Sequence, residues 1–216
     1  MLFFVVARIS SILTVFGLRD SRDRRRGRLT FAVVLYFFLL TGGAVSYAQE
    51  RAAKAVIVFY SWSGDTERVV KILKEKTGSD TICIRPSVPY PRDYMATLER
   101  AREEKKRLYD AGEYPPIHPT EKILEAYDTI IVCYPVWLGK MAFPMQSFLR
   151  IHADTFAGKD IALITLSGKS PGEKTLPDAG RLCPGSRVLG LLSIKRADRE
   201  GEPRMIDLFI TRVLHK

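Results

Sequence analysis

Hydroxyl-bearing residues are concentrated at residues 61–66, Ser-Trp-Ser-Gly-Asp-Thr, where they could bind an anion. This hexapeptide lies between an uninterrupted apolar run, residues 55–60, and a segment of helical character, residues 67–77. Short apolar runs rich in β-branched residues are typical of strands buried on both faces. A polar turn between such a strand and a helix gathers free backbone N–H groups where the helix dipole is positive. The hexapeptide therefore indicates either a phosphate-binding loop or an ordinary Ser/Thr-rich helix cap.

Two common nucleotide-binding motifs are missing from this first loop. It contains no lysine and no G-x-x-x-x-G-K-[ST] pattern, which excludes the P-loop of nucleotide-hydrolysing proteins. The dinucleotide fingerprint G-x-G-x-x-G is missing as well. If the loop binds phosphate, it does so through neutral donors: the hydroxyls of Ser61, Ser63 and Thr66, with Gly64 allowing close backbone approach.

Further apolar runs predict four more strands, at residues 81–85, 129–134, 160–166 and 187–194. Helices are expected at residues 93–110, 121–127, 144–154 and 203–216, and a variable loop is expected before the last strand. The inner face of the last helix is predicted to contain Ile206, Leu208, Phe209 and Val213. Strands that alternate with helices predict a parallel α/β sheet, with ligands bound outside the carboxyl ends of its strands.

Four segments follow, in the same order, the motifs of one protein family. Residues 60–66 are similar to Tyr-Ser-x-Ser/Thr-Gly-Asn-Thr, and the second loop, residues 134–140, contains Pro-Val-Trp-Leu-Gly where relatives usually read Pro-Ile-Trp-Trp-Gly. The third loop, residues 165–172, reads Thr-Leu-Ser-Gly-Lys-Ser-Pro-Gly, and residues 182–186 look like the turn Leu-Cys-Pro-Gly-Ala. On these motifs residues 54–195 resemble the flavodoxin family, specifically its small flavodoxin-like members.

The resemblance implies an α/β flavodoxin-like fold: a doubly wound five-stranded parallel sheet of order 2-1-3-4-5 with helices on both faces. It also implies FMN, with the phosphate in the first loop and the flavin ring between the second and third loops. Trp137 would offer a face for ring stacking, and Gly139 and Gly168 would allow close main-chain contacts. The implied cofactor-binding residues are Ser61, Trp62, Ser63, Gly64, Asp65, Thr66, Pro135, Val136, Trp137, Leu138, Gly139, Ser167, Gly168 and Gly172.

Three departures from the family pattern widen the choice of function. Asp65 replaces an asparagine, which exchanges a donor for an acceptor that repels phosphate, although aspartate is still a good N-cap. Leu138 replaces a second tryptophan, and Lys169-Ser170-Pro171 replaces a more glycine-rich stretch. The first interpretation is an electron carrier that uses FMN. The alternatives are an FMN-dependent NAD(P)H or quinone reductase and a module that has lost FMN, so the sequence does not decide whether the protein is an enzyme.

The N-terminal segment suggests export. Residues 29–48 carry no charge, follow five arginines between residues 22 and 28, and end in Ser46-Tyr47-Ala48, a small-x-Ala cleavage pattern. This order is typical of a secretory signal peptide, and an uncleaved membrane anchor is the alternative. We therefore expect an N-terminal extension, residues 1–48, and a flavodoxin-like domain, residues 49–216, outside the cytoplasm: periplasmic, extracellular or anchored to the membrane and facing outward.

Charge and cysteine content limit which partners and which redox chemistry are expected. The chain has a net charge of +10, and since residues 1–48 hold seven of its 34 basic and two of its 24 acidic residues, the remainder has +5. A basic surface favours anionic lipid or an acidic partner, whereas no nucleic-acid motif occurs. The resemblance adds a redox partner protein or a small quinone-like acceptor. Cys83, Cys133 and Cys183 form no C-x-x-C, so neither a dithiol site nor a metal is expected, and we predict buried, inert thiols.

Overall fold

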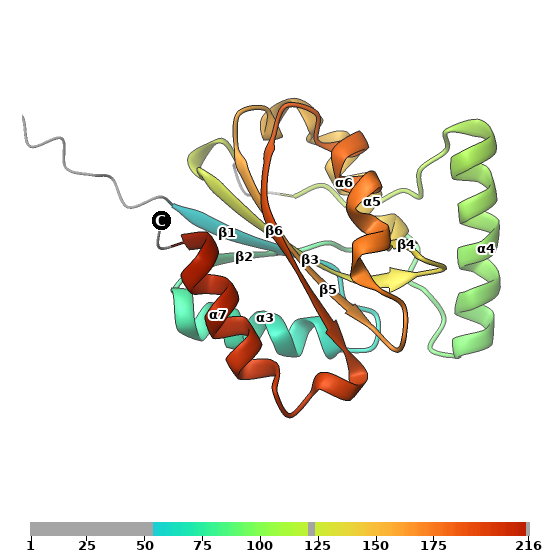
Figure 1. Cartoon of the computed structure of the whole chain (residues 1–216). Helices are drawn as coiled ribbons and strands as arrows, with labels where there is room; N and C mark the ends of the chain where they lie inside the picture. Colours follow the sequence, from blue (N-terminus) through green and yellow to red (C-terminus); the bar gives the residue numbers. More distant parts are fainter. Residues whose placement is uncertain (1–53, 121–123, 215–216) are drawn as a thin grey trace, which may run out of the picture. The chain divides into compact units, whose positions relative to one another are not determined.

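The computed structural model of the chain describes residues 54–120 and 124–214, and their central feature is a mostly parallel sheet (Figure 1). Within these residues the sheet has six strands, and its parallel part has the order β2-β1-β3-β5-β6. The short strand β4 pairs antiparallel with β3. The predicted order 2-1-3-4-5 is confirmed, because β5 and β6 are the fourth and fifth parallel strands. The strands are β1 (Ala55–Phe59), β2 (Asp80–Cys83), β3 (Thr129–Trp137), β4 (Lys140–Met141), β5 (Asp160–Ser167) and β6 (Arg187–Lys195).

Strand β1 is buried on both of its faces, as its apolar run predicts. Val56 and Val58 belong to the core cluster on one side of the sheet. Ile57 and Phe59 belong to the cluster on the other side. Both edges of β1 are also paired, one with β2 and the other with β3. A strand enclosed in this way must be apolar at nearly every position, which explains the uninterrupted run.

Helices cover both faces of the sheet (Figure 1). The helices α3 and α7 share one face, where their apolar side chains join the cluster of Ile57 and Phe59. The helices α5 and α6 contribute to the opposite cluster, and α4 packs against Phe143 of α5. The doubly wound architecture is therefore confirmed. The helices are α3 (Asp65–Thr77), α4 (Tyr94–Ala111), α5 (Phe143–Ile151), α6 (Leu176–Leu182) and α7 (Glu202–Leu214), with 3-10 helices η1 (Leu124–Ala126), η2 (Ala153–Phe156), η3 (Gly172–Thr175) and η4 (Arg196–Asp198).

The structure corrects the variable loop that was expected before the last strand. Residues 172–182 form η3 and then α6. Pro177 and Gly180 give this segment a weak intrinsic helix propensity. Tertiary contacts compensate, because Asp178 accepts hydrogen bonds from the Met141 N–H and the Tyr109 hydroxyl, both at 3.2 Å. Sequence-local reasoning missed α6 since these contacts come from elsewhere in the chain.

The inner face of α7 is correctly predicted except at one position. Ile206, Phe209 and Val213 are buried, whereas Leu208 is 66 % exposed. Ile210 is buried in its place. The buried positions thus follow the spacing i, i+3, i+4 and i+7 of an amphipathic helix, and Leu208 lies off that stripe.

The three cysteines are free thiols within the described residues, in agreement with the prediction. Strand β1 separates the strand of Cys83 from the strand of Cys133. Cys133 and Cys183 are buried, and burial raises the pKa of the Cys183 thiol to about 12. Cys83 is exposed, so the prediction of a buried thiol is wrong at that position.

Parts of the predicted organisation fall outside the described residues. The signal or anchor segment at residues 1–48 and the domain boundary that follows it lie there, as do residues 121–123 of a short predicted helix of which η1 is described. Among the helices of residues 54–120 and 124–214, none combines the length and the apolar character that a membrane span needs.

Substitutions in α7 test the assignment of its buried face. We expect Ile206→Ala to lower the free energy of unfolding by about 2–5 kcal/mol, because it leaves a cavity in the core. Leu208→Ala should change it by less than about 0.5 kcal/mol, because the side chain is exposed. Urea unfolding followed by circular dichroism measures both effects. Equal losses for the two variants would contradict the assignment.

Candidate functional site

The first loop connects β1 to α3 and is built around Ser61. The Oγ atom of Ser61 accepts hydrogen bonds from the backbone N–H groups of Gly64 (3.2 Å) and Glu67 (3.3 Å). Gly64 has φ +90°, which places it in the left-handed region just before the helix begins. Residues other than glycine rarely adopt this conformation, so Gly64 shapes the turn. The loop therefore contains both the helix-capping contacts and the hydroxyl-rich surface that the sequence suggested.

Asp65 does not cap the helix, contrary to the expectation from its residue type. It is the first residue of α3, and Gly64 occupies the N-cap position without a side-chain cap. The Asp65 carboxylate instead accepts a hydrogen bond from the Ser63 hydroxyl at 3.0 Å. Its other oxygen lies 3.5 Å from a guanidinium nitrogen of Arg199. The acidic residue in the first loop is thus paired with a cation from the segment after β6.

Arg68, which the sequence analysis did not single out, connects the same loop region to α7. Its guanidinium forms a bidentate ion pair with Glu202, with Nη1 bonded to Oε1 and Nη2 to Oε2. Glu202 is buried, and the hydrogen bond between the two side chains raises the pKa of Arg68. The Nε atom of Arg68 is buried and has no hydrogen-bond partner within the described residues.

The second loop forms a tight β-hairpin. Strand β3 continues through Pro135 and Val136 to Trp137, and Trp137 pairs with Lys140 of β4. Leu138 (φ +51°) and Gly139 (φ +73°) form the two-residue turn. Positive φ at both central positions is the geometry of a type I′ turn, which glycine tolerates and leucine disfavours. Gly139 is therefore required by the turn itself.

Trp137 is held by an aromatic cluster. Its ring lies nearly perpendicular to that of Tyr60, with centroids 5.5 Å apart, and at 72° to that of Tyr90, with centroids 4.9 Å apart. The Arg100 guanidinium covers Tyr90 at 3.9 Å from its centroid, and Glu104 accepts the Tyr90 hydroxyl. Burial raises the pKa of Tyr60 and of Tyr90. These contacts fix the orientation of the indole beside the first loop.

The third loop separates into an open part and a buried part. Gly168 is exposed, and no atom would touch a Cβ added there. The Ser167 hydroxyl donates to the Ser170 carbonyl at 2.6 Å. Gly172 is buried, and its N–H donates to the Ser193 hydroxyl at 3.0 Å. Gly172 therefore serves packing between η3 and the sheet rather than contact with a ligand.

The three loops converge on one cavity of about 570 Å³, which is in the range of small-molecule sites. Ten of the fourteen predicted site residues line it, namely Trp62, Ser63, Asp65, Thr66, Pro135, Val136, Trp137, Leu138, Ser167 and Gly168. The four predicted residues that lie outside its wall, all of them in the described part of the chain, are Ser61, Gly64, Gly139 and Gly172. All four shape the first loop, the hairpin turn or the packing behind the third loop.

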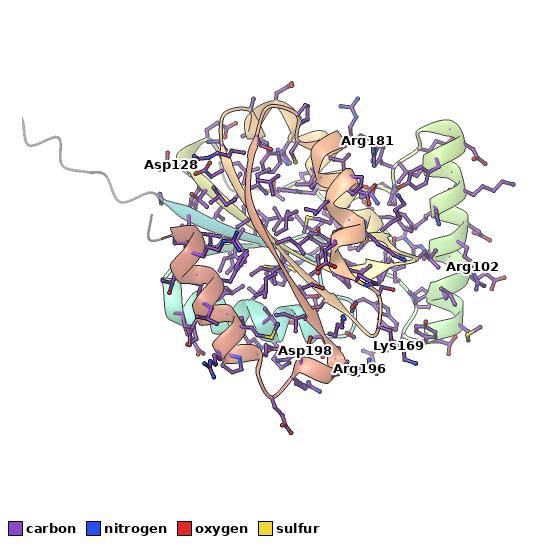
Figure 2. All side chains as sticks on the ribbon, in the orientation of Figure 1. Arg102, Asp128, Lys169, Arg181, Arg196 and Asp198 are labelled. Atoms are coloured by element: carbon purple, nitrogen blue, oxygen red, sulfur yellow. The ribbon has the colours of Figure 1, made fainter. Side chains whose placement is uncertain are left out.

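The wall also contains residues that sequence reasoning missed. Helix α4 contributes Tyr94, Thr97, Leu98 and Ala101. The cations are Arg68, Lys169, Lys195, Arg196 and Arg199. Figure 2 shows Lys169 and Arg196 at the same end of the sheet and Asp128, which precedes β3, at the other. Lys169 lies in the third loop that the motifs had identified, whereas the only signal for the other cations was the positive charge of residues 49–216, which does not tell where the charge lies.

The fold and the cavity define a class: a doubly wound α/β protein with a small-molecule site at the carboxyl edge of its parallel strands. The flavodoxin family matches residues 54–192, and the chain belongs to this family. Membership confirms the resemblance read from the four motifs and supports FMN as the cofactor. Among functionally curated proteins, none matches the chain.

Solved structures with a similar fold include bacterial flavoproteins. A flavoprotein from Lactobacillus acidophilus in complex with FMN is 22 % identical, with a TM-score of 0.57, and the match covers 69 % of this chain and 98 % of that one. A candidate flavoprotein from Bacteroides eggerthii is 21 % identical, with a TM-score of 0.60 and coverage of 73 % and 98 %. Likenesses at this level of identity show the fold.

A substitution at Gly172 tests its packing role. A Cβ at this position would clash with the Thr165 hydroxyl and approach the Ser193 hydroxyl to 2.8 Å. We expect Gly172→Ala to destabilise the protein by about 1–3 kcal/mol through overpacking. Gly180→Ala is the matched control, because no atom lies within 4 Å of the added methyl group. In a helix this control should be neutral or stabilising by up to about 1 kcal/mol. Thermal unfolding of both variants measures the difference, and a neutral Gly172→Ala would show that the loop adapts.

Proposed function

We propose that this protein binds FMN in the cavity described above and transfers electrons outside the cytoplasm. The observation that carries the proposal is the convergence of three loops, far apart in sequence, on one cavity that contains Trp137 and the hydroxyl-rich first loop. FMN supplies the redox chemistry when bound, and the protein supplies binding, orientation and electrostatics.

The residues of the cavity fit the two ends of FMN. The hydroxyls of Ser63 and Thr66 and the cations nearby are suited to a phosphate. Trp137 and Val136 offer apolar surface to the flavin ring, and exposed Gly168 leaves room for its edge. The donor set is therefore consistent with FMN despite Asp65 and Leu138.

An electron carrier needs an exposed route to its partner. Lys169, Lys195 and Arg196 are exposed on the rim of the cavity. No ion pair involves any of these three within the described residues. A cationic rim favours an acidic redox partner, because complementary charge steers association and fixes orientation. The proposed partner is therefore an acidic redox protein, with a small quinone-like acceptor as the alternative.

A second candidate function is an FMN-dependent NAD(P)H or quinone reductase. One wall of the cavity favours it: Tyr94 is 62 % exposed and Leu138 stands where relatives carry a tryptophan. A smaller, more open wall leaves space for a second substrate beside the flavin. Oxidation of NAD(P)H by the FMN-loaded protein would favour this reductase over a carrier.

Titration with FMN tests the proposed function. We expect the purified protein to bind FMN with quenching of flavin fluorescence and to become yellow. Trp137→Leu should weaken binding by about 0.5–1.5 kcal/mol, or about two- to tenfold, because stacking is lost. Trp137→Phe should retain most of the affinity. Leu208→Ala is the control, because it removes an exposed apolar side chain that does not line the cavity. A folded protein that binds no FMN would instead favour a module that has lost the cofactor.

The proposal of export rests on the uncharged segment at residues 29–48. In a bacterial host, Leu35→Arg should retain the full-length protein in the cytoplasm, because a charge interrupts the apolar block that export recognises. Leu35→Ile is the matched control and should be exported normally. Fractionation followed by immunoblotting measures the distribution, and equal export of both variants would contradict the proposal. Cleavage after Ala48 or retention in the membrane fraction separates a signal peptide from an anchor.

A further inference from the structure

Arg199 brings a positive charge to the first loop from a remote part of the chain. It follows η4, between β6 and α7, and its Nη2 atom lies 3.5 Å from Oδ1 of Asp65. Both side chains line the cavity. The second oxygen of Asp65 accepts the Ser63 hydroxyl. One carboxylate therefore links a candidate phosphate-binding hydroxyl to a guanidinium that the loop itself lacks.

The other arginine close to this loop is already engaged. Arg68, whose side chain is partly exposed, holds both oxygens of buried Glu202 in a bidentate pair, and breaking that pair would leave the buried carboxylate uncompensated. The only ion pair of Asp65 among the described residues is the one with Arg199. Arg199 is thus the cation joined directly to the first loop, whereas Lys195 and Arg196 line the cavity without an ion pair to that loop.

The pair between Asp65 and Arg199 is loose enough to exchange partners. The Arg199 side chain is 60 % exposed, that of Asp65 is 38 % exposed, and a single contact of 3.5 Å joins them. Exposed ion pairs of this kind contribute little to stability. A phosphate dianion offers a guanidinium more charge and more acceptor oxygens than one carboxylate does. Arg199 can therefore contact a phosphate in the loop without a large loss elsewhere.

We infer that Arg199 is a phosphate-binding residue of this cavity and makes it selective for phosphorylated flavin over riboflavin. Without ligand, Arg199 balances the charge of Asp65. With ligand, its guanidinium contacts the phosphate. The pair of Asp65 and Arg199 thus replaces the neutral asparagine of relatives, and its cation is available to the phosphate. This role rests on the proposed function, since it requires that the cavity bind a flavin.

Parallel titrations with FMN and riboflavin test the inference through binding alone. We expect Arg199→Ala to weaken FMN binding about tenfold, because a hydrogen bond to a charged group is lost. Riboflavin binding should change less than about twofold, because riboflavin has no phosphate for Arg199 to contact. Arg199→Lys should retain part of the affinity, since it keeps the charge but not the planar fork. Flavin fluorescence quenching gives both dissociation constants, and thermal unfolding verifies that each variant is folded.

Variants of two further arginines distinguish a direct phosphate contact from a diffuse positive electrostatic potential. Arg102 lies on α4 and points away from the cavity in Figure 2, so Arg102→Ala should leave both dissociation constants unchanged. Arg196 lines the cavity, and Arg196→Ala should weaken FMN binding less than Arg199→Ala does. A loss at Arg196 that equals or exceeds the loss at Arg199 would overturn the inference in favour of a diffuse positive potential.

The companion substitution Asp65→Asn completes a double-mutant cycle. Alone it should strengthen FMN binding, because it removes a like charge and releases Arg199. Because Asp65→Asn releases Arg199 from its ion pair, we expect Arg199→Ala to weaken FMN binding more in the Asp65→Asn background than in the wild type. A second cycle, Asp65→Asn with Arg102→Ala, is the control and should be additive. If the changes in binding free energy for Asp65→Asn and Arg199→Ala are also additive, the ion pair seen in the structure has no role in binding, which would count against the inference.

The failure of the inference differs from the failure of the proposed function. A wild-type protein that binds neither flavin would overturn the proposed function. A wild-type protein that binds FMN as tightly as the Arg199→Ala variant does would overturn the inference alone. Equal losses for FMN and riboflavin in the folded Arg199→Ala variant would also overturn it, because they would assign to Arg199 a structural role instead of phosphate contact.

Discussion

The enclosure of β1 between β2 and β3 is the constraint on which the site depends. Phe59 is in register with Cys83 on one side and with Cys133 on the other, so β1 and β2 end at the same level while β3 continues to Trp137. The Tyr60 N–H extends this alignment by one residue, since it donates to the Cys133 carbonyl at 3.1 Å. Because the neighbouring strands are parallel, the loops after β1 and β3 leave the sheet side by side, and β5 adds the third loop next to them. Burial of apolar residues on both faces therefore assembles a polar site at the edge.

The strands and most helices could be predicted from the sequence because they depend on local patterns. Residues buried on both faces give continuous apolar runs, and β1, β3 and β5 were found within a few residues of their bounds. Elements that depend on distant contacts were missed. Helix α6 contains proline and glycine and is held by Asp178, and the hairpin after β3 requires positive φ at Leu138, which nothing about leucine predicts. Leu208 was misassigned because its apolar character outweighed its position relative to the buried stripe of α7.

The loop residues of the candidate site could be predicted from sequence motifs, whereas its charged pairs could not be predicted. The resemblance identified the three loops, and ten of its fourteen residues line the cavity. Arg68 and Glu202 are 134 residues apart in sequence, and the pair between Asp65 and Arg199 likewise joins the first loop to the segment after β6. Such pairs leave no periodic signal in a sequence, because each charged residue taken singly looks like part of a solvated surface. They become visible only once the fold brings α3 and α7 together.

These two pairs make α7 part of the site rather than only a cover for the sheet. Glu202 begins the helix and is buried against Arg68, and Arg199 lies three residues before it. Ile206 and Phe209 anchor the same helix in the core shared with α3. A shift of α7 along the sheet would therefore move the cations at the first loop, because one continuous segment carries both the apolar anchor and the charged residues. The packing of α7 against the face of the sheet that it shares with α3 thus positions the charged residues at the carboxyl edge of the strands.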